Sequence, residues 1–521
     1  MDNRDVEEAK RYHQTTKHSP RSVRQSAHYL DWDNRPYLYK VYPDLSPIPL
    51  PRDYARPGAD TLRAVASSEC DQDKGLTVLE LSQLLFFSAG LTKKKILPGG
   101  EEYHFRAAAC AGALYPIEIY VVSTDISGLE AGVYHFHPRE FALRQLRSGD
   151  FRPELAGAAG DNQTVAAAPI TLVFSAIFWR SAWKYQARSY RYCFWDTGTI
   201  LANLLATAAS EETPCSVEMG FVDSQVNHLL GLDGEREASL ALVPLGRSLE
   251  WATHAVTREI PALSYRTDPL SDREVNYPDL QRMHASSCLV ADEEIRPWRG
   301  TCPRPRSEAG NPTVPLGPSV GSANPLGQAI LKRGSTRHFD RKAISLSQLA
   351  MILDSSTRGI PADFLEGPET SLLDLYLIAN AVEGLEPGAY YFSPTERRLE
   401  CLKKGSLRHE AAYLCLEQPL PGDAGAVVFF LSDLNRILPR FGNRGYRAAQ
   451  MEAGIIGGKL YLSAYSLGLG ATGLTFYDDD VVEFFSPHAQ GKDAIFLVAL
   501  GRSRTSGASD LVQPSTSRII R

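Results

Sequence analysis

The chain repeats itself after 256 residues, and this duplication limits the folds it can adopt more than any other feature. The pair Tyr190-Arg191 recurs as Tyr446-Arg447, and the difference between 447 and 191 is 256. The same offset aligns, without a gap, Tyr134, Phe136, Pro138, Leu143, Leu146 and Gly149 with Tyr390, Phe392, Pro394, Leu399, Leu402 and Gly405. A repeat this long indicates a duplicated domain and not a solenoid of short units. Two copies of one fold in a single chain predict an intramolecular pseudo-dimer.

The composition is that of a globular protein without a strongly charged face. The chain has 521 residues, 43% hydrophobic, with a net charge of −6, which is enough for two or three domains with their own cores. The interspersed charges predict neither a nucleic-acid partner nor an anionic membrane surface. No apolar run approaches the roughly 18 residues of a membrane span, and the charged start lacks a signal core. We therefore expect a soluble, cytoplasmic protein.

The cysteines and histidines do not have the spacing of a metal site. Eight cysteines are scattered along the chain without a CxxC pair, so no structural zinc is predicted and the thiols are expected to be reduced. His135 and His137 alternate in a β-like run, but Tyr391 and Ser393 stand at the equivalent positions of the second copy. We expect no metal.

Both copies show the same order of helical and extended segments. In the first copy, residues 79–91 and 190–209 have helical apolar spacing, while residues 117–123, 134–138, 170–178 and 239–245 look extended. In the second copy the corresponding ranges are 346–353 and 447–467 for helices, and 373–378, 389–394, 427–431 and 494–500 for strands. Several strands follow one another too closely for βαβ crossovers, which favours an α+β fold.

Composition also predicts the domain boundaries. Residues 1–58 are polar, aromatic and proline-bearing, so we expect an extended N-terminal arm lying on the globular body. Residues 59–250 form the first domain and residues 325–505 the second. A proline-rich and charged linker, ordered in its first half, spans residues 251–324, and residues 506–521 form a flexible tail.

A glycine-rich segment near the C-terminus matches the GxGxxG pattern, but its context is wrong for a dinucleotide site. Gly468-Leu469-Gly470-Ala471-Thr472-Gly473 follows an apolar helix and precedes an extended run, whereas the dinucleotide fingerprint needs a strand before it and a helix after it. Two alternatives stay open. The glycines either end the helix or let the backbone lie flat against a planar ligand.

The second copy opens with a cluster suited to a phosphate. Arg333, Ser335 and Arg337 place two guanidinium groups and a hydroxyl within five residues, and guanidinium forks bind phosphate through charge-assisted contacts. The alternative is a solvated surface turn. At the equivalent place the first copy has Ser68-Glu69-Cys70-Asp71-Gln72, where both cations are lost and two acids repel an anion.

These features together resemble a known family. The RxSxR opening, the glycine-rich segment after a long helix and the closing Gly501-Arg502-Ser503-Arg504 are similar to the nitroreductase fold of flavin enzymes, in which FMN lies at a dimer interface. The segment from Phe105 to Pro116, with Glu118-Ile119-Tyr120 after it, resembles the SagB/ThcOx branch, which includes azoline dehydrogenases of peptide pathways. The resemblance covers about residues 60–250 and 325–505.

The resemblance implies which residues hold the cofactor. Arg333, Ser335 and Arg337 would bind the FMN phosphate, assisted by Arg502, and Gly470, Ala471, Thr472 and Gly473 would line the flavin ring from the second copy. Arg106, Cys110, Ala111 and Gly112 would contribute the loop of the first copy. The family usually has Pro-Ser where this chain has Ala109-Cys110, so a serine contact to flavin is not expected here.

The two copies supply different halves of the site. The second copy has no Ala-Gly-Ala-Leu-Tyr-Pro segment within residues 355–369, and the first copy lacks the phosphate cluster. The loop of one copy and the phosphate residues of the other make one complete site. We expect one FMN per chain, bound between the two domains.

A second asymmetry indicates where proton transfer occurs. Lys184-Tyr185 resembles the Lys-Tyr motif of azoline dehydrogenases and aligns with Arg440-Phe441. Lysine and tyrosine exchange protons when burial or a neighbouring cation shifts their pKa, whereas arginine and phenylalanine do not. We predict Lys184 and Tyr185 as the catalytic pair; the alternative is a pair that only packs at a helix.

Three functions are compatible with the sequence. The first is an FMN-dependent dehydrogenase that oxidises a peptide thiazoline or oxazoline to the azole, with hydride transfer to flavin N5 and a cyclodehydratase as a possible partner. The second is an NAD(P)H-dependent reductase of nitro compounds, quinones or activated alkenes. The third is a non-catalytic scaffold that binds a peptide or partner enzyme, and the intact phosphate cluster argues against it.

Overall fold

The computed structural model describes residues 2–67, 73–96, 100, 102–248, 259–303, 310–317, 324–366 and 370–504. The predicted acidic segment at 68–72, the tail at 506–521 and parts of the predicted linker therefore lie outside the described residues.

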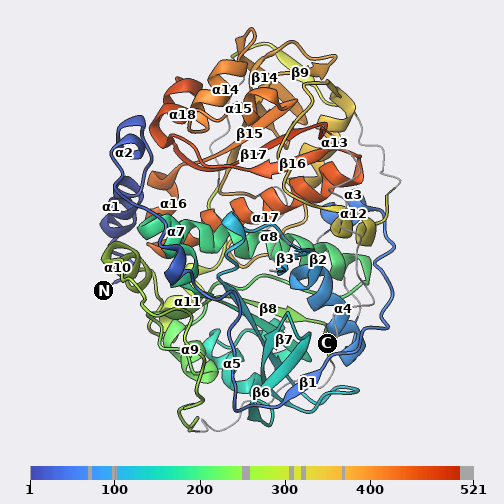
Figure 1. The fold of residues 1–521 in the computed structure, drawn as a ribbon, viewed down its shortest axis with the longest axis vertical. Coiled ribbons are helices and arrows are strands. Elements are labelled where there is room, and N and C mark those ends of the chain that lie inside the picture. Colours follow the sequence, from blue (N-terminus) through green and yellow to red (C-terminus); the bar gives the residue numbers. More distant parts are fainter. Residues whose placement is uncertain are drawn as a thin grey trace.

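Each copy folds around an antiparallel sheet with a long helix on one face. The first sheet has the strand order β1-β6-β5-β4-β7-β8, and it is packed against α8 (Figure 1). The expected helices and strands of this copy all form, which confirms the α+β class. Its elements are α3 (Thr61–Ala66), α4 (Val78–Ala89), β2 (Leu91–Ile96), β3 (Glu102–Arg106), η2 (Ala111–Ala113), β4 (Ile117–Ser123), β5 (Gly132–His137), β6 (Ala142–Ser148), α5 (Arg152–Ala158), α6 (Gln163–Ala167), β7 (Ile170–Ile177), α7 (Phe178–Tyr185), η3 (Gln186–Arg188), α8 (Ser189–Ser210), α9 (Asp223–Leu230) and β8 (Glu237–Leu245).

The second copy repeats this architecture. Its sheet has the order β16-β17-β15-β11-β13-β14-β9, and α17 covers one face as α8 does in the first copy (Figure 1). Its elements are α12 (Leu326–Lys332), β10 (Ile344–Ser345), α13 (Leu346–Ser356), β11 (Asp374–Ala379), β12 (Val382–Glu383), β13 (Gly388–Ser393), β14 (Arg398–Lys404), α14 (Arg408–Leu414), α15 (Pro419–Asp423), β15 (Ala426–Ser432), α16 (Leu434–Phe441), α17 (Arg444–Ser466), β16 (Gly470–Gly473), α18 (Asp478–Phe485) and β17 (Asp493–Gly501).

The two copies meet where α8 and α17 pack side by side in the middle of the molecule (Figure 1). Gly198 and Gly454 are repeat equivalents, and they touch at this contact: a Cβ built on Gly198 would lie 2.5 Å from the Gly454 carbonyl carbon. Gly458 meets its own equivalent, Ala202, in the same way, with the two Cβ positions 2.5 Å apart. Residues that touch their own repeat equivalents lie on a twofold axis, so the chain is an intramolecular pseudo-dimer.

Reciprocal ion pairs tie the copies together. Arg188 and Arg191 of the first copy bind Asp478 of the second, with nitrogen–oxygen distances of 3.0 and 2.8 Å. In the reverse direction, the carboxylate of Asp223 lies 2.6 and 2.8 Å from the arginines equivalent to these, Arg444 and Arg447. All four arginines are buried. The recurrence of Tyr190-Arg191 as Tyr446-Arg447 therefore reflects a role in joining the copies.

The N-terminal segment is partly helical, which differs from the extended arm expected from its prolines. It forms α1 (Glu7–Thr15), α2 (Pro20–Arg24), η1 (Trp32–Asn34) and the edge strand β1 (Pro47–Pro49). Tyr12 on α1 is fully buried, and its ring meets those of Tyr190 and Tyr446 edge-on at 5.8 Å each. The helix forms because this buried face lies before the first proline, Pro20, which itself occupies a first-turn position.

The segment between the copies is also ordered where it is described. It forms α10 (Pro278–Ser286), α11 (Asp292–Trp298) and the edge strand β9 (Thr313–Pro315). Strand β9 pairs with β14 at the edge of the second sheet, as β1 pairs with β6 in the first. The linker thus mirrors the arm and adds an equivalent edge strand to the other copy.

Candidate functional site

The predicted site residues of the two copies meet at the pseudo-dimer interface, and Arg333 joins them. Its guanidinium is buried and donates to three backbone carbonyls of the first copy, Ala107 at 2.8 Å, Arg106 at 2.7 Å and Ala108 at 3.1 Å. These carbonyls begin the predicted loop. The phosphate contact of Arg333 stays a prediction, and the structure adds that this residue fixes the loop of one copy against the other.

The glycine-rich segment forms a strand and not a dinucleotide-binding turn. After α17 ends, Gly468 adopts a φ of +74° and residues 470–473 form β16. The backbone N–H of Thr336 donates to the Ala471 carbonyl at 2.9 Å, which places the RxSxR segment beside this strand. A Cβ on Gly470 would lie 2.1 Å from the hydroxyls of both Thr336 and Ser503. Only glycine fits at this close approach.

Tyr461 completes this part of the site and was not predicted from the sequence. Its hydroxyl accepts the N–H of Gly473 at 2.6 Å and lies 3.3 Å from the hydroxyl of Ser335. One phenol on α17 therefore connects two predicted segments. Its position on the helix gave no signal, because a tyrosine in a long apolar helix is usually a core residue.

Lys184 of the first copy and Arg337 of the second are close enough for the charge of one to act on the other. Lys184, at the end of α7, is half-buried. Burial is the main cause that lowers the pKa of Lys184, and the charge of Arg337 in the second copy lowers it further. Among the described residues neither cation has an ion-pair partner. Two like charges brought together without a carboxylate favour an anionic ligand between or beside them.

The predicted loop and the Lys-Tyr pair lie in contact. Gly112 has a φ of +62°, and a Cβ there would be 2.9 Å from the Tyr185 hydroxyl and 3.4 Å from Lys184 Nζ. The Tyr185 ring stacks on Tyr192 of α8 with centroids 4.2 Å apart and planes 14° apart. Burial raises the pKa of Tyr185 well above its usual value. The hydroxyl makes no hydrogen bond to a described residue, so it is available to a ligand.

A buried carboxyl, also missed by sequence reasoning, holds the loop from behind. Asp196 on α8 accepts the Ala111 N–H at 2.8 Å and the Cys110 thiol at 3.1 Å. Burial raises the Asp196 pKa to about 7, since the two hydrogen bonds only partly offset the desolvation. Burial and the nearby carboxyl raise the pKa of Cys110, so this thiol stays neutral. The repeat equivalent of Asp196 is Glu452. An acid at the same position of both copies is a signal in the sequence that the two residues share a role.

Two predicted arginines make their hydrogen bonds to other parts of the chain. Arg106 is buried and donates to the carbonyls of Leu38 at 3.0 Å and Ile117 at 3.4 Å, which ties the N-terminal segment to the base of the loop. Arg502 is exposed and donates Nε to the Ala343 carbonyl at 2.9 Å. Their contacts to cofactor stay predictions.

The pseudo-symmetric position on the other side of the axis is filled by the chain itself. Arg440 and Phe441 stand there in place of Lys184 and Tyr185, and Arg440 donates to carbonyls of residues 297, 298, 299 and 301. Trp298 is fully buried, packs 5.6 Å from the Phe441 ring and donates its indole N–H to the Phe441 carbonyl at 3.0 Å. Linker residues thus occupy the place that a second ligand would need.

Comparison with known proteins agrees with this architecture. The sequence profile of the Nitroreductase family matches residues 75–247 and again residues 330–502. The chain belongs to the nitroreductase family. A crystal structure of a nitroreductase from Anabaena variabilis has a TM-score of 0.76 and 28% identity, and the match covers 95% of this chain and 99% of that one. The two nitroreductase domains therefore stand in tandem over nearly the whole chain.

Two curated relatives each match one part of this chain. The nitroreductase-type protein MJ1384 of Methanocaldococcus jannaschii is 33% identical over 175 residues, which are 34% of this chain and 83% of that protein. The Microcin B17-processing protein McbC of Escherichia coli is 31% identical over 136 residues, which are 25% of this chain. The match spans 49% of McbC, about half of its length.

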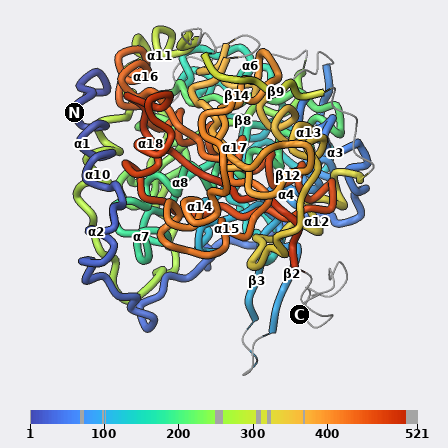
Figure 2. The backbone as a smooth tube through the Cα atoms, turned by 90° about the horizontal axis from the view of Figure 1, so that it is seen from above, coloured from blue at the N-terminus to red at the C-terminus, as the bar shows by residue number. Residues whose placement is uncertain are grey.

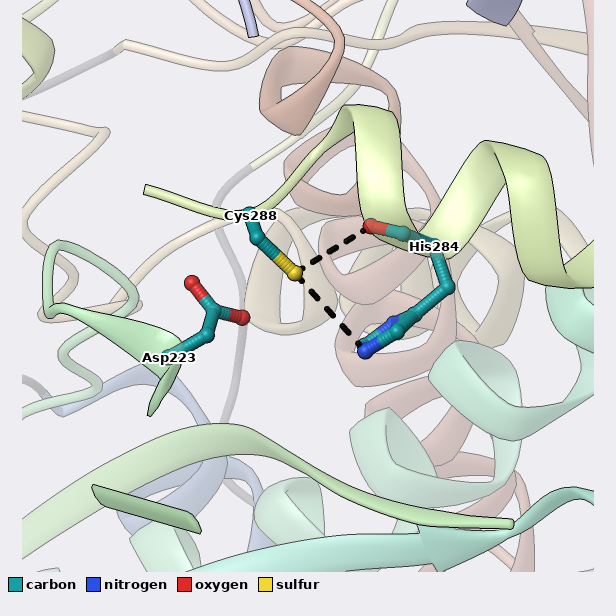
Figure 3. Close-up of side chains that lie close together, drawn as sticks. All are labelled: Asp223, His284 and Cys288. Carbon is teal, nitrogen blue, oxygen red and sulfur yellow. Dashed lines mark hydrogen bonds between the residues drawn. The ribbon is translucent and has the colours of Figure 1, made fainter. Parts of the chain in front are cut away.

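Three neighbouring side chains of this chain are of the types that bind metal ions, but the charges around them do not favour a cation. Asp223, His284 and Cys288 lie close together in the interface (Figure 3). Both oxygens of Asp223 are bound by buried arginines, and Arg447 also donates to Cys288 Sγ at 3.3 Å and to the His284 carbonyl at 2.8 Å. Two guanidinium charges repel a metal cation, so this group is an ion-pair network.

The site residues fit FMN, the cofactor that the family implies. Lys184 and Arg337 have no ion-pair partner among the described residues, so they suit an anion. In the strand β16 beside Tyr461, a Cβ added to Gly470 would fill the space in front of the backbone. Arg333, Ser335 and Arg337 would hold the phosphate, and residues 470–473 with the 110–112 loop would contact the ring.

Among the described residues, no helix is both long and apolar enough to cross a membrane.

Proposed function

We propose that this member of the nitroreductase family is an FMN-dependent dehydrogenase that oxidises an azoline ring of a peptide to the azole, with one FMN between the two domains. The observation that carries the proposal is the Lys184–Tyr185 pair held against Gly112 of the loop, where the charge of Arg337 of the other copy also acts on Lys184. The similarity to McbC, which is named for processing Microcin B17, supports a peptide substrate. We further propose a peptide cyclodehydratase as partner, and a cytoplasmic location.

The reaction removes two hydrogens from the ring. A thiazoline or oxazoline already holds its ring C=N bond. It loses a hydride from one of the two neighbouring sp3 ring carbons and a proton from the other, and a carbon–carbon double bond forms between these two carbons. Bound FMN would supply the two-electron acceptor, and dioxygen would regenerate it. The protein must therefore provide a base and hold the ring beside it.

Lys184 is the better base, and Tyr185 the better hydrogen-bonding partner. Burial and Arg337 lower the pKa of Lys184, which increases the fraction of neutral amine that can take the ring proton. Burial raises the pKa of Tyr185, so its phenol stays protonated and can orient the substrate. The hydroxyl points at the loop near Gly112, and the stacked Tyr192 fixes the ring plane. The two residues thus divide the tasks of accepting the proton and positioning the ring.

A synthetic thiazoline peptide tests this function. The purified protein reconstituted with FMN should convert it aerobically to the thiazole, seen by mass spectrometry as the loss of two hydrogens. Lys184→Ala should lower the turnover by about 10²–10⁴-fold at unchanged FMN content, since that is the usual contribution of a general base. Tyr413→Phe, an exposed tyrosine of the second copy bonded to Asp480, should turn over as the wild type does.

Stopped-flow reduction by NADPH separates this proposal from the reductase alternative. A dedicated azoline dehydrogenase should show slow bleaching of the flavin by NADPH and fast bleaching by the thiazoline peptide. Fast bleaching by NADPH alone, with no azole formed from any azoline peptide, would overturn the proposal in favour of a reductase.

A further inference from the structure

A surface pocket of about 420 Å³ lies where the N-terminal segment meets the β2–β3 hairpin. This hairpin projects from the body of the molecule (Figure 2). The pocket is lined by residues 35–39 of the N-terminal segment, residues 102–104 of β3 and Arg139 after β5. Tyr37 is 43% exposed, and Tyr103 is partly exposed, so aromatic surface is open to a ligand.

The charge of this pocket is positive. Arg35 lies over two aromatic rings, with its guanidinium carbon 5.8 Å from the Tyr103 centroid, and Arg139 donates to the Tyr37 hydroxyl at 3.1 Å. Neither arginine has a carboxylate partner among the described residues. Glu102 is the one acid among the described residues that line the pocket, and it is already paired with Lys94 at 2.7 Å. Two guanidinium groups are therefore left to bind an anion.

The buried guanidinium of Arg180 joins the pocket to the proposed active site, in addition to that of Arg106. Arg180 donates Nε to the Tyr37 carbonyl at 3.0 Å, and Nη1 to the Tyr115 carbonyl at 3.1 Å. Tyr37 lines the pocket, and Tyr115 ends the loop that carries Gly112. The width of one guanidinium thus separates the pocket wall from the loop. Arg180 is fully buried and ion-paired with Glu118, which makes this link rigid.

We propose that this pocket binds a carboxylate of the peptide substrate, a few residues from the ring that reacts beside Tyr185. Arg35 and Arg139 would hold the carboxylate through charge-assisted hydrogen bonds, and Tyr37 and Tyr103 would pack on the neighbouring peptide. The inference rests on the proposed function in that it takes the ligand to be a peptide. The carboxylate comes either from an acidic side chain or from the peptide C-terminus.

Fluorescence anisotropy with labelled peptides that contain no azoline ring tests this site without flavin chemistry. Two C-terminally amidated peptides differ only in one Asp or Asn, and a third carries Asn with a free C-terminus. The full-length protein should bind the Asp peptide about tenfold more tightly than the Asn peptide, the low end for a charge-assisted contact at a partly exposed site. Tighter binding of the third peptide alone would assign the carboxylate to the C-terminus.

Arginine variants locate the effect. Arg35→Gln and Arg139→Gln should each remove most of the preference for the acidic peptide, and Arg35→Lys, which keeps the charge, should retain part of it. Arg21→Gln is the matched control, because Arg21 is an exposed arginine of the same segment that bonds only to Gln25 and does not line the pocket. Unchanged melting temperatures would show that the variants are folded.

Three outcomes would overturn the proposal: equal binding of all three peptides, an unchanged preference for the carboxylate peptide in both glutamine variants, or tighter binding of NADPH that is lost in Arg35→Gln. The last outcome would assign the pocket to a nucleotide phosphate. If the pocket fails any of these tests while a neutral thiazoline peptide is still oxidised, the proposed function stands without it. If acidic peptides bind but no azoline is oxidised, the pocket stands and the proposed function fails.

Discussion

The glycine pair at the pseudo-dimer axis sets how closely the two halves of the site approach each other. We predict that Gly198→Ala destabilises the protein although alanine is the better helix former. The new Cβ would lie 2.5 Å from the Gly454 carbonyl carbon and 2.5 Å from the Ile455 nitrogen. Both are backbone atoms of a buried helix, so no side chain can rotate out of the way.

The size of the effect follows from that distance. Non-bonded carbons approach to about 3.5–4.0 Å, so α8 and α17 must separate by about 1 Å. Overpacking a well-packed contact costs about 1–3 kcal/mol, and a backbone collision belongs at the upper end. Alanine recovers about 1 kcal/mol of helix propensity. The net loss should be about 2 kcal/mol, which lowers the melting temperature of a large domain by about 4–8 °C.

Thermal denaturation with a matched glycine substitution tests this reasoning. Gly157→Ala on α5 has nothing within 4 Å of its new Cβ, so it should melt at or above the wild-type temperature. Gly454→Ala should resemble Gly198→Ala, and the double variant should lose less than the two single losses combined, because the helices have already separated. Separated copies should also retain FMN less well. A Gly198→Ala protein that melts at or above the wild-type temperature would refute the argument.

Three further predictions concern the buried acids and the loop. Asp223→Asn should lower the free energy of unfolding by about 3–5 kcal/mol, because it leaves buried arginines without their charged partner. Asp479→Asn, at an exposed ion pair, should lower it by less than about 1 kcal/mol. Urea denaturation measures both losses, and equal losses would contradict the buried ion-pair network. Asp196 has a folded pKa of about 7, above its unfolded value of about 3.9, so the folded state binds its proton more tightly. Its contribution is present below about pH 4 and is lost as the pH rises through about 7. The stability of the wild type relative to Asp196→Asn should therefore fall over this range, and a constant difference in urea unfolding would contradict the pKa shift. Gly112→Ala should lower azoline oxidation at nearly unchanged melting temperature, because its Cβ would meet the Tyr185 hydroxyl at 2.9 Å; full activity would remove the loop from the site.

Much of the fold could be predicted from periodicity, because each core element has a clear apolar pattern. The segment 117–123 is strand β4 with the same bounds, and the expected helix at 447–467 is α17, which begins three residues earlier and ends one residue earlier. The helix α1 was missed because its burial comes from Tyr12, which packs on two tyrosines of different copies. Such long-range packing leaves no local pattern.

The candidate site was only partly visible in the sequence. The repeat indicated that one copy carries the loop with Gly112 and the other the Arg333–Arg337 cluster, because losses in each copy can be read against the other. Tyr461 was missed, since a single polar residue in an apolar helix looks the same whether it braces a loop or packs in a core. Asp196 was also missed, and its one signal in the sequence was the acid at its repeat equivalent, Glu452. Their roles depend on which backbone groups they reach, 2.8 Å to Ala111 and 2.6 Å to Gly473.

The sequence by itself determined that the chain is a tandem α+β protein whose copies have diverged at the positions of one site. The apolar periodicity involves neighbouring residues, and the repeat has a constant offset along the chain. The order of residues is therefore sufficient to reveal both. Only the tertiary structure decided that Arg333 bonds the loop of the other copy, that Lys184 and Tyr185 lie against Gly112, and that Trp298 fills the pseudo-symmetric position. These facts depend on how two separately folded copies pack across an axis, and the close approach of two glycines on facing helices sets that distance.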